Sequence, residues 1–504
     1  MRATVPRVAA GGLALALTGC ALAANTARSY ATAPNGMEAG EVALRRSLEA
    51  GRVDSLWALF SGGAKRRGPT DDLLRLMYQG LLAYYAGSYE ASAGALDRAY
   101  ALAEDRYTNS ATRAAASLLT NDLALEYEPG HTERLLIHYY AMLDYLRRDS
   151  LEGAVVEARR LSHQLQRFDE QRASADVSTR ALLRYLAGAV FEAAGEAADA
   201  EVAYRNARAL AGDSAFPAAS MLPPDTARPR GRRGLARGAG AQPAGEVVVI
   251  LEHGFVAHRV HQGFTVALRR DEVSGFEHDR KHDRDSTARR VSARVYTHVL
   301  GRADDGLWVR EKTDAHGHHR AELDLNDGDA DVYLTVSWPG YRRPRHAAPA
   351  ARVVGPEGRT ATVSMLANVS DAVAGDFRRE RGQILARSIA RAAAKRAVAE
   401  AAGRQAKKKG DEAGWLAKWG VSAVGSLMDR ADLRSWHLLP GEIGIVRLSL
   451  PAGRHALSLD TTGDRGQRLP YAPLGEVDVR PGEIRFVTTR LWCDPDAPPS
   501  TTGR

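Results

Sequence analysis

Cysteine is the residue type in this sequence that is most able to form a covalent bond, and it occurs at two positions. Cys20 follows a short apolar segment, and Cys493 lies near the other end beside Trp492. A thiol can take a lipid, or act as a nucleophile once it is deprotonated. A disulfide framework needs more cysteines at closer spacing, so we expect no bridge between these two. We interpret Cys493 as an inert thiol and Cys20 as the site of a modification.

The residues before Cys20 are organised like an export signal. A basic start with Arg2 and Arg7 is followed by an apolar run, which ends in Leu17-Thr18-Gly19-Cys20. This segment resembles the lipobox of bacterial lipoproteins, in which small residues let a signal peptidase cut just before the cysteine. The resemblance implies that residues 1–19 are a signal peptide and that the Cys20 thiol takes a diacylglycerol. The alternative is an ordinary secretory peptide with an incidental cysteine.

A lipid on Cys20 also implies a location for the chain. After cleavage the amine of Cys20 can take another acyl chain, and two or three chains anchor a protein stably where one does not. Ala21 stands where some enteric bacteria place the aspartate that retains lipoproteins in the inner membrane, so an outer-membrane anchor facing the periplasm is favoured. The sequence has no other run of about 20 apolar residues. We expect a lipid-anchored protein of the bacterial cell envelope.

Histidines are concentrated in the second half of the chain, which raises the question of a metal site. Zinc needs three or four ligands that converge, and the spacing here matches no helical metal motif. Charged residues surround several of these histidines, so we favour surface loops and predict no metal ligand. The set comprises His253, His258, His261, His278, His282, His298, His316, His318 and His319.

An acidic run over residues 324–331 could suit calcium, because hard cations prefer several oxygens from one short loop. In an EF-hand that begins at Asp324, a glycine is required where Asp329 stands and a glutamate where Thr335 stands. We therefore interpret the run as a solvated turn. The sequence has no phosphate-binding glycine loop, no Gly-x-Ser-x-Gly elbow and no Cys–His pair placed for nucleophilic attack. No catalytic residue and no cofactor is predicted.

The elements that position these residues must come from more than one domain. Of the 504 residues, 44% are hydrophobic and 26% are charged, which is typical of folded protein. This length favours two or three domains. The net charge of +8 is a small excess of 69 basic over 61 acidic residues. Nucleic-acid-binding proteins concentrate positive charge more strongly, so we expect no nucleic-acid partner.

Composition divides the mature chain into successive segments. Residues 20–40 are typical of a flexible lipidated tether, and residues 41–212 have an almost continuous helical pattern. Residues 213–245 form a linker rich in Pro, Gly and Arg, whose arginines we interpret as solvated. Residues 246–493 contain short apolar runs typical of strands, and residues 494–504 are predicted to be a disordered tail.

The helical segment contains a repeated spacing of small residues. Gly80 and Gly87 recur as Gly188 and Gly195, and a third, degenerate copy has Asp149 in place of the turn glycine. This spacing resembles the tetratricopeptide repeat, in which two antiparallel helices pack through small residues. The alternative is a generic helical bundle rich in alanine.

The resemblance to tetratricopeptide repeats implies a binding surface. In that fold the first helix of each repeat lines a concave groove, and the usual ligands are extended peptides or helices. Aromatic and arginine side chains contribute strongly to such interfaces. The alternative is that these tyrosines only fill space between helices. The implied groove residues are Tyr84, Tyr85, Tyr139, Arg147 and Tyr185.

The second half is predicted to be β-rich and sandwich-like, with a helical insert over about residues 377–428. The insert contains a basic amphipathic helix that could lie on a membrane, but its apolar side is mostly alanine, so we favour packing on the β-rich segment. The closing hairpins resemble small antiparallel sandwiches. The fold class is therefore α+β multidomain. The strands are predicted at residues 247–251, 264–268, 291–299, 332–338, 360–367, 443–450, 455–459, 477–479 and 484–491.

Several short segments together suggest a family. They include Glu133-Arg134, Glu246-Val247-Val248-Val249 and Arg434-Ser435-Trp436. On these segments the chain resembles an uncharacterised family of bacterial lipoproteins with tetratricopeptide-like repeats and a β-rich C-terminal half, which implies architecture and envelope location but no activity. We expect a membrane-anchored scaffold or adaptor that binds an unknown envelope protein. The alternative is an envelope enzyme or metal-binding protein centred on the histidine-rich region.

Overall fold

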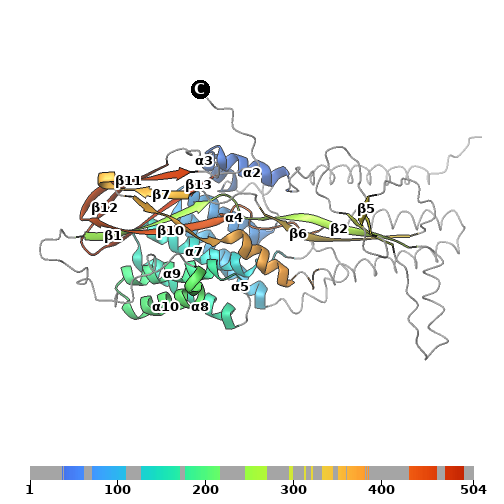
Figure 1. Cartoon of the computed structure of the whole chain (residues 1–504), viewed down its shortest axis with the longest axis horizontal. Helices are drawn as coiled ribbons and strands as arrows, with labels where there is room; N and C mark the ends of the chain where they lie inside the picture. The colour runs from blue at the N-terminus through green and yellow to red at the C-terminus, as the bar shows by residue number, and fades with distance from the viewer. Residues whose placement is uncertain are drawn as a thin grey trace, which may run out of the picture.

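The computed structural model describes residues 37, 39–61, 71–108, 126–170, 176–215, 244–268, 294–298, 311–313, 319–321, 332–343, 350–358, 360–380, 382, 384, 431–462 and 472–492. Helices make up most of the described chain before residue 216, and strands make up most of it after residue 243 (Figure 1). The α+β arrangement with a β-rich C-terminal half is therefore as predicted.

The described helices of the first half pair into hairpins. α2 (Ala39–Glu49) and α3 (Val53–Ser61) come first. The hairpins that follow are α4 (Asp72–Tyr85) with α5 (Tyr89–Thr108), α7 (His131–Arg147) with α8 (Leu151–Glu170), and α9 (Ser178–Ala193) with α10 (Ala197–Ala215). Each turn contains one residue with positive φ, namely Gly87 (74°), Asp149 (54°) and Gly195 (79°). Glycine and aspartate both tolerate this backbone conformation, which explains the residue types at the three turns.

Small residues let the two helices of a hairpin approach closely. A Cβ atom added at Gly80 of α4 would lie 2.6 Å from the Leu96 side chain of α5. One added at Gly188 of α9 would lie 2.9 Å from the ring of Tyr204 of α10. These contacts are shorter than packed carbon atoms tolerate, so glycine is required where the facing residue is large.

Two four-stranded sheets form the body of the second half. Their strand orders are β13-β1-β10-β9 and β12-β11-β7-β8. The turn at Pro451–Gly453 connects β10 of the first sheet to β11 of the second, so the closing hairpin predicted from the sequence does not form there. In the first sheet β1 pairs antiparallel with β10 and parallel with β13. The bounds are β1 Ala244–His253, β7 Ala350–Val354, β8 Thr360–Thr362, β9 Ser364–Asn368, β10 Glu442–Pro451, β11 Gly453–Thr462, β12 Ala472–Val479 and β13 Ile484–Leu491.

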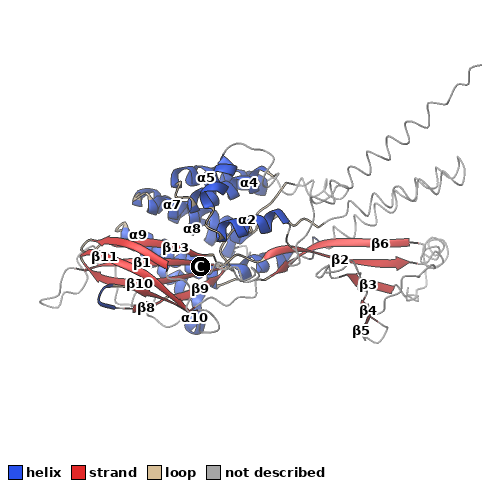
Figure 2. Ribbon diagram, turned by 90° about the horizontal axis from the view of Figure 1, so that it is seen from above, coloured by secondary structure: helices blue, strands red, loops and turns tan. Residues whose placement is uncertain are grey.

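β1 is covered on both faces. Every residue from Val247 to His253 is buried, whereas a strand with one solvated face would alternate between buried and exposed residues. The second sheet covers one face, because a Cβ atom added at Gly245 would lie 2.7 Å from Val479 of β12. The other face lies against the helical hairpins. The hairpin helices α7 to α10, the first sheet and the second sheet therefore follow one another as layers (Figure 1), and Figure 2 shows the same elements from above.

Helix α7 is buried as completely as β1. Every residue from Thr132 to Asp144 is buried. A helix that is covered all round lies between two other layers. Here those layers are α5 and α8 on one side and the first sheet on the other.

A third sheet extends away from the sandwich. It has the order β5-β4-β3-β2-β6. β2 and β6 pair along their full lengths, from His258 opposite Arg342 to Leu268 opposite Val332. Figure 1 shows these two strands running outward from the body. The bounds are β2 His258–Leu268, β3 Arg294–His298, β4 Glu311–Thr313, β5 His319–Ala321 and β6 Val332–Arg342.

The predicted strands at residues 247–251, 264–268, 332–338 and 443–450 lie within β1, β2, β6 and β10. Several details differ from prediction, since β2 and β12 begin earlier than predicted and β6 ends later. Residues 360–367 form β8 and β9 with a break at Val363, and the next helix begins at residue 369 instead of 377. Asn368 explains the early start, because its Oδ1 accepts a hydrogen bond from the Asp371 amide (2.9 Å) and caps the helix. Residues 381, 383 and 385–428 of the predicted insert lie outside the described residues.

Candidate functional site

The predicted groove tyrosines lie between the helices and the chain's own first sheet. Tyr84 at the end of α4 is buried, and its hydroxyl donates to Oγ1 of Thr488 in β13 (2.9 Å). The hydroxyl of Tyr139 in α7 donates to Oε1 of Glu252 in β1 (3.0 Å). Tyr185 in α9 is also buried, and its ring lies 5.3 Å from that of Tyr204. The sheet thus occupies the side of the helices on which the sequence predicts a partner groove.

Tyr85 belongs to a buried cluster around Glu252 and Arg490. The Tyr85 hydroxyl accepts from Nη1 of Arg490 (2.9 Å) and lies 3.0 Å from the hydroxyl of Tyr140. Nη1 of Arg490 is 3.3 Å from Oε2 of Glu252, and Nη2 donates to the Gly254 carbonyl (2.6 Å). Burial lowers the pKa of Arg490, but Tyr85 and Glu252 more than offset this effect and raise it above its ordinary value. The cluster is a charge pair surrounded by hydroxyl groups and bonded across the layers.

Arg147 is separate from the other predicted groove residues. Its side chain is exposed at the end of α7, where Nε donates to the hydroxyl of Tyr89 (2.9 Å). The guanidinium carbon lies 5.3 Å from the centre of the Tyr89 ring. Arg147 therefore packs along the edge of the helical layer, and the structure does not bring it together with Tyr85 or Tyr139.

A second polar junction joins the first helix to the loop before β10. Arg45 of α2 donates from Nη2 to the carbonyl of Val256 (2.8 Å) and to that of His437 (2.7 Å). Nδ1 of His437 lies 3.1 Å from Oε1 of Glu41. Burial raises the pKa of Glu41, but the charges and hydrogen bond of His437 and Arg45 outweigh it and hold the pKa below its usual value.

A third junction joins the last hairpin to β10. Arg447 of β10 donates to Glu192 of α9 (2.8 Å), to Tyr204 of α10 (3.2 Å) and to Glu246 of β1 (2.8 Å from Nε). Burial raises the pKa of Glu192, but the bond to Arg447 outweighs it and lowers the pKa below its usual value. One guanidinium thus holds together three elements from both layers.

A fourth junction involves two of the segments on which the family resemblance rests. Oε1 of Glu133 in α7 accepts from the Trp436 amide (2.9 Å), and Oε2 accepts from the Gly130 amide (3.1 Å). Nearby, Oδ2 of Asp376 accepts from the Thr132 amide (2.7 Å). Burial raises the pKa of Asp376 to about 7. The start of α7 is therefore fixed by two carboxylates, one of them from the second half of the chain.

These junctions can position elements, because their charged groups bond to each other or to backbone groups of other elements. The residues predicted from the sequence do not include Glu252, Arg490, His437 or Arg447. A signal was present for Glu252, which directly follows the apolar run Val247–Leu251 of β1, but not for Arg490, because β13 also contains Arg485, Thr488 and Thr489. Glu252 and Arg490 face each other in the parallel register of these strands. A charged residue at the end of a buried apolar strand is the pattern that could have identified Glu252.

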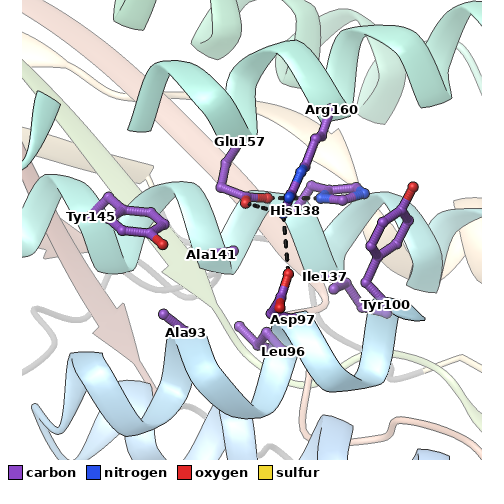
Figure 3. Close-up of a pocket in the computed structure, with 10 residues that line it drawn as sticks. All are labelled: Ala93, Leu96, Asp97, Tyr100, Ile137, His138, Ala141, Tyr145, Glu157 and Arg160. Carbon is purple, nitrogen blue, oxygen red and sulfur yellow. Dashed lines mark hydrogen bonds and ion pairs between the residues drawn. The ribbon is translucent and has the colours of Figure 1, made fainter. Parts of the chain in front are cut away.

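A small pocket lies on the other side of the helical layer, between α5, α7 and α8 (Figure 3). Nδ1 of His138 lies 2.9 Å from Oε2 of Glu157. Arg160 donates from Nη1 to Oε1 of Glu157 (2.8 Å) and to Oδ1 of Asp97 (3.2 Å). The ring of Tyr100 lies 4.5 Å from that of His138. The remaining cavity is about 20 Å³, which has room for one water molecule, so these side chains nearly fill it.

A larger groove lies between α8, α9 and α10. Its volume is about 550 Å³, which is within the range of ligand-binding sites. It is lined by Arg159, Ser162, His163, Gln166, Asp169, Arg184, Phe191, Asp199, Val202, Ala203, Asn206, Ala209 and Leu210. This groove combines an open volume of that size with apolar and charged walls. We take it as the candidate functional site.

Several sequence predictions fall outside the described residues. These are Cys20 with the signal peptide, the linker arginines, the acidic run over residues 324–331, Cys493, and His278, His282, His316 and His318. Within the described residues, no helix is long and apolar enough to cross a membrane. The described part of the chain also has no group of three or more His, Cys, Asp or Glu side chains that could hold a metal ion.

Comparison with known proteins adds no relative. No family model, no curated protein and no solved structure matches this chain. The resemblance to a family of bacterial lipoproteins therefore stays a prediction from the sequence.

Proposed function

We propose that this chain is a membrane-anchored scaffold of the bacterial cell envelope, held by a lipid on Cys20, that binds a partner protein through its helical hairpins. The observation that supports a scaffold role most directly is the bonded interface between the helical layer and the first sheet. Charged and hydroxyl groups join the layers at Glu252, Arg45, Arg447 and Glu133. Such an interface favours a rigid body that presents a fixed outer surface.

We further propose that the hairpins are tetratricopeptide-like repeats. Two features support this assignment. The three turns have a residue of positive φ at Gly87, Asp149 and Gly195. Gly80 and Gly188 each stand seven residues before a turn glycine and face a large side chain of the next helix. The repeat spacing and the helix packing therefore agree in two of the three hairpins.

The inner side of these hairpins is covered, which favours the outer side for partner binding. An external ligand on the tyrosines would have to displace β1 and β13 and leave Glu252 and Arg490 without their bonds. Breaking such a buried charge cluster costs several kcal/mol. The envelope partner that we propose therefore binds the side formed by α5, α8 and α10.

Lipidation is tested by growing cells with an alkyne analogue of palmitate and fractionating the envelope. The wild type is expected to take the label and to sediment with the membranes. Cys20→Ser should lose the label and become soluble, while the matched variant Cys493→Ser should keep both properties. An unlabelled, soluble wild type would overturn the proposed anchor.

A further inference from the structure

The pocket and the groove occupy equivalent places in two successive pairs of hairpins. Each lies between the second helix of one hairpin and both helices of the next. The turn residues Gly87, Asp149 and Gly195 fix the register between them. Each pocket residue has an equivalent in the groove at the same distance from its turn. Tyr100, Glu157 and Arg160 of the pocket correspond to Ser162, Ala203 and Asn206 of the groove. His138 of the pocket corresponds to Arg184.

The difference between the two sites follows from these replacements. In the pocket, Tyr100, Glu157 and Arg160 fill the space between the helices and leave about 20 Å³. In the groove, the equivalent residues are smaller, and about 550 Å³ stays open. These three smaller side chains therefore contribute to the opening of the groove. The same three positions offer a means to close it.

The two ends of the groove have opposite charge. At one end Asp169 pairs with both Arg180 and Arg184, so two guanidinium groups share one carboxylate. At the other end Nη2 of Arg159 lies 2.7 Å from Oε2 of Glu196 and 3.7 Å from Oδ2 of Asp199, so two carboxylates share one guanidinium. A ligand with an acidic group at one end and a basic group at the other would complement both.

The middle of the groove is apolar. Phe191, Val202, Ala203 and Leu210 contribute to its walls. Val202 is 44% exposed and is one of three large hydrophobic side chains that are exposed among the described residues. Apolar surface that is left in water between polar ends is typical of a protein-binding site.

We propose that this groove binds an amphipathic helix of the partner protein. At 1.5 Å per residue, the wall from Arg159 to Asp169 is about 15 Å long, which matches about three helical turns. The apolar side of the bound helix packs between α8 and α10, with an acidic residue near Arg184 and a basic residue near Asp199. This mode of recognition is common for helical ligands. The inference rests on the proposed scaffold role and names its surface.

The test uses a phage-displayed library of 14-residue peptides, with apolar residues fixed at helical spacing and all other positions varied. The library is selected on the purified full-length mature protein in detergent. Selected peptides are expected to have acidic and basic residues at opposite ends. Their binding should weaken at least tenfold in the triple variant Ser162→Tyr, Ala203→Glu, Asn206→Arg, which recreates the side chains that fill the first pocket.

A matched pair of exposed valines guards against misfolding of the triple variant. Val202→Glu changes the groove wall, while Val177 is 40% exposed and does not line the groove. Binding should weaken at least tenfold in Val202→Glu and stay unchanged in Val177→Glu. Asp199→Lys should shift the selection toward peptides that are acidic at both ends.

Three results would overturn the proposal. The first is that the selected peptides bind the folded triple variant as tightly as they bind the wild type. The second is that the selection enriches no peptide on the wild type over that variant. The third is that Val202→Glu and Val177→Glu weaken peptide binding equally. The selection uses purified protein, so its outcome does not depend on lipidation. If Cys20→Ser leaves labelling and location unchanged while the peptides still require the groove, the anchor fails and the binding site stands.

Discussion

Arg490 and Glu252 form an ion pair between β13 and β1, with 3.3 Å between Nη1 and Oε2 and side-chain exposures of 7% and 2%. The two residues are opposite each other in the parallel strand register. Tyr139 donates to the same carboxylate from helix α7. A single buried charge pair therefore joins the last described strand, the first strand of the sandwich and the helical layer.

Arg490→Met should destabilise the protein by about 3–5 kcal/mol, because it leaves Glu252 buried without its countercharge. The double variant Arg490→Met, Glu252→Gln should recover much of this loss, since it removes both charges. Urea unfolding followed by circular dichroism provides the measurement. Arg454→Met is the matched control, because Arg454 pairs with Glu476 (3.4 Å) at a side-chain exposure of 74%. The control should change stability by less than about 1 kcal/mol. Equal effects in Arg490→Met and Arg454→Met would contradict the role of burial.

Gly188→Ala should destabilise the protein by about 1–3 kcal/mol, because the added methyl group would overlap the ring of Tyr204. That ring cannot easily move, since the Tyr204 hydroxyl donates to Glu192 (2.6 Å). Gly94→Ala in α5 is the matched control, because a Cβ atom there meets nothing within 4 Å. It should stabilise the helix by about 0.5–1 kcal/mol. Thermal unfolding distinguishes the two, and a stabilising Gly188→Ala would mean that the hairpin packs differently.

Stability should fall as the pH rises from about 6.5 to 8. Burial raises the pKa of Asp144 to about 8 and that of Asp376 to about 7, from an ordinary value of 3.8. The folded state then binds protons that the unfolded state has released, so the free energy of unfolding decreases with pH above about 4. Burial lowers the pKa of His131 from 6.5 to about 4, which has the opposite effect below pH 6.5. Above pH 6.5, the expected change in stability therefore comes from Asp144 and Asp376 and not from His131.

The free energy of unfolding should fall by about 1–2 kcal/mol less between pH 6.5 and 8 in Asp144→Asn than in the wild type, because the variant side chain has no proton to release. Urea midpoints at several pH values measure the slope. Leu143→Ala is a useful control on the same helix, since it should lower stability by a similar amount at each pH. If Asp144→Asn leaves the wild-type slope intact, Asp144 does not titrate in the folded state near neutral pH.

Helices and strands that are determined by residues close together in the chain could be predicted from the sequence. The apolar run Val247–Leu251 predicts a buried strand, and β1 lies there. The spacing of Gly80 and Gly87 predicts two packed helices with a turn, and α4 and α5 form such a hairpin. Both predictions depend on residues within about 20 positions of each other, where periodicity and turn chemistry are informative.

The layer arrangement could not be predicted from local patterns. Tyr84 and Thr488 are far apart in the chain, and nothing in either local pattern indicates that their hydroxyls meet. The same aromatic residues suit an external partner or an internal sheet equally well, because both offer polar groups beside apolar surface. The open groove was also missed, since it depends on small residues at Ser162, Ala203 and Asn206 relative to the preceding hairpin.

Native-state hydrogen exchange tests most directly whether the helical layer and the first sheet form one rigid scaffold. The amides to follow are those of Leu135–Leu143 in α7 and Val247–Leu251 in β1. If the polar junctions unite the layers, both sets should exchange through the same global opening, with one free energy and one dependence on denaturant. Exchange of the α7 amides at a free energy several kcal/mol below that of β1 would show that the helices open independently, and would contradict the scaffold.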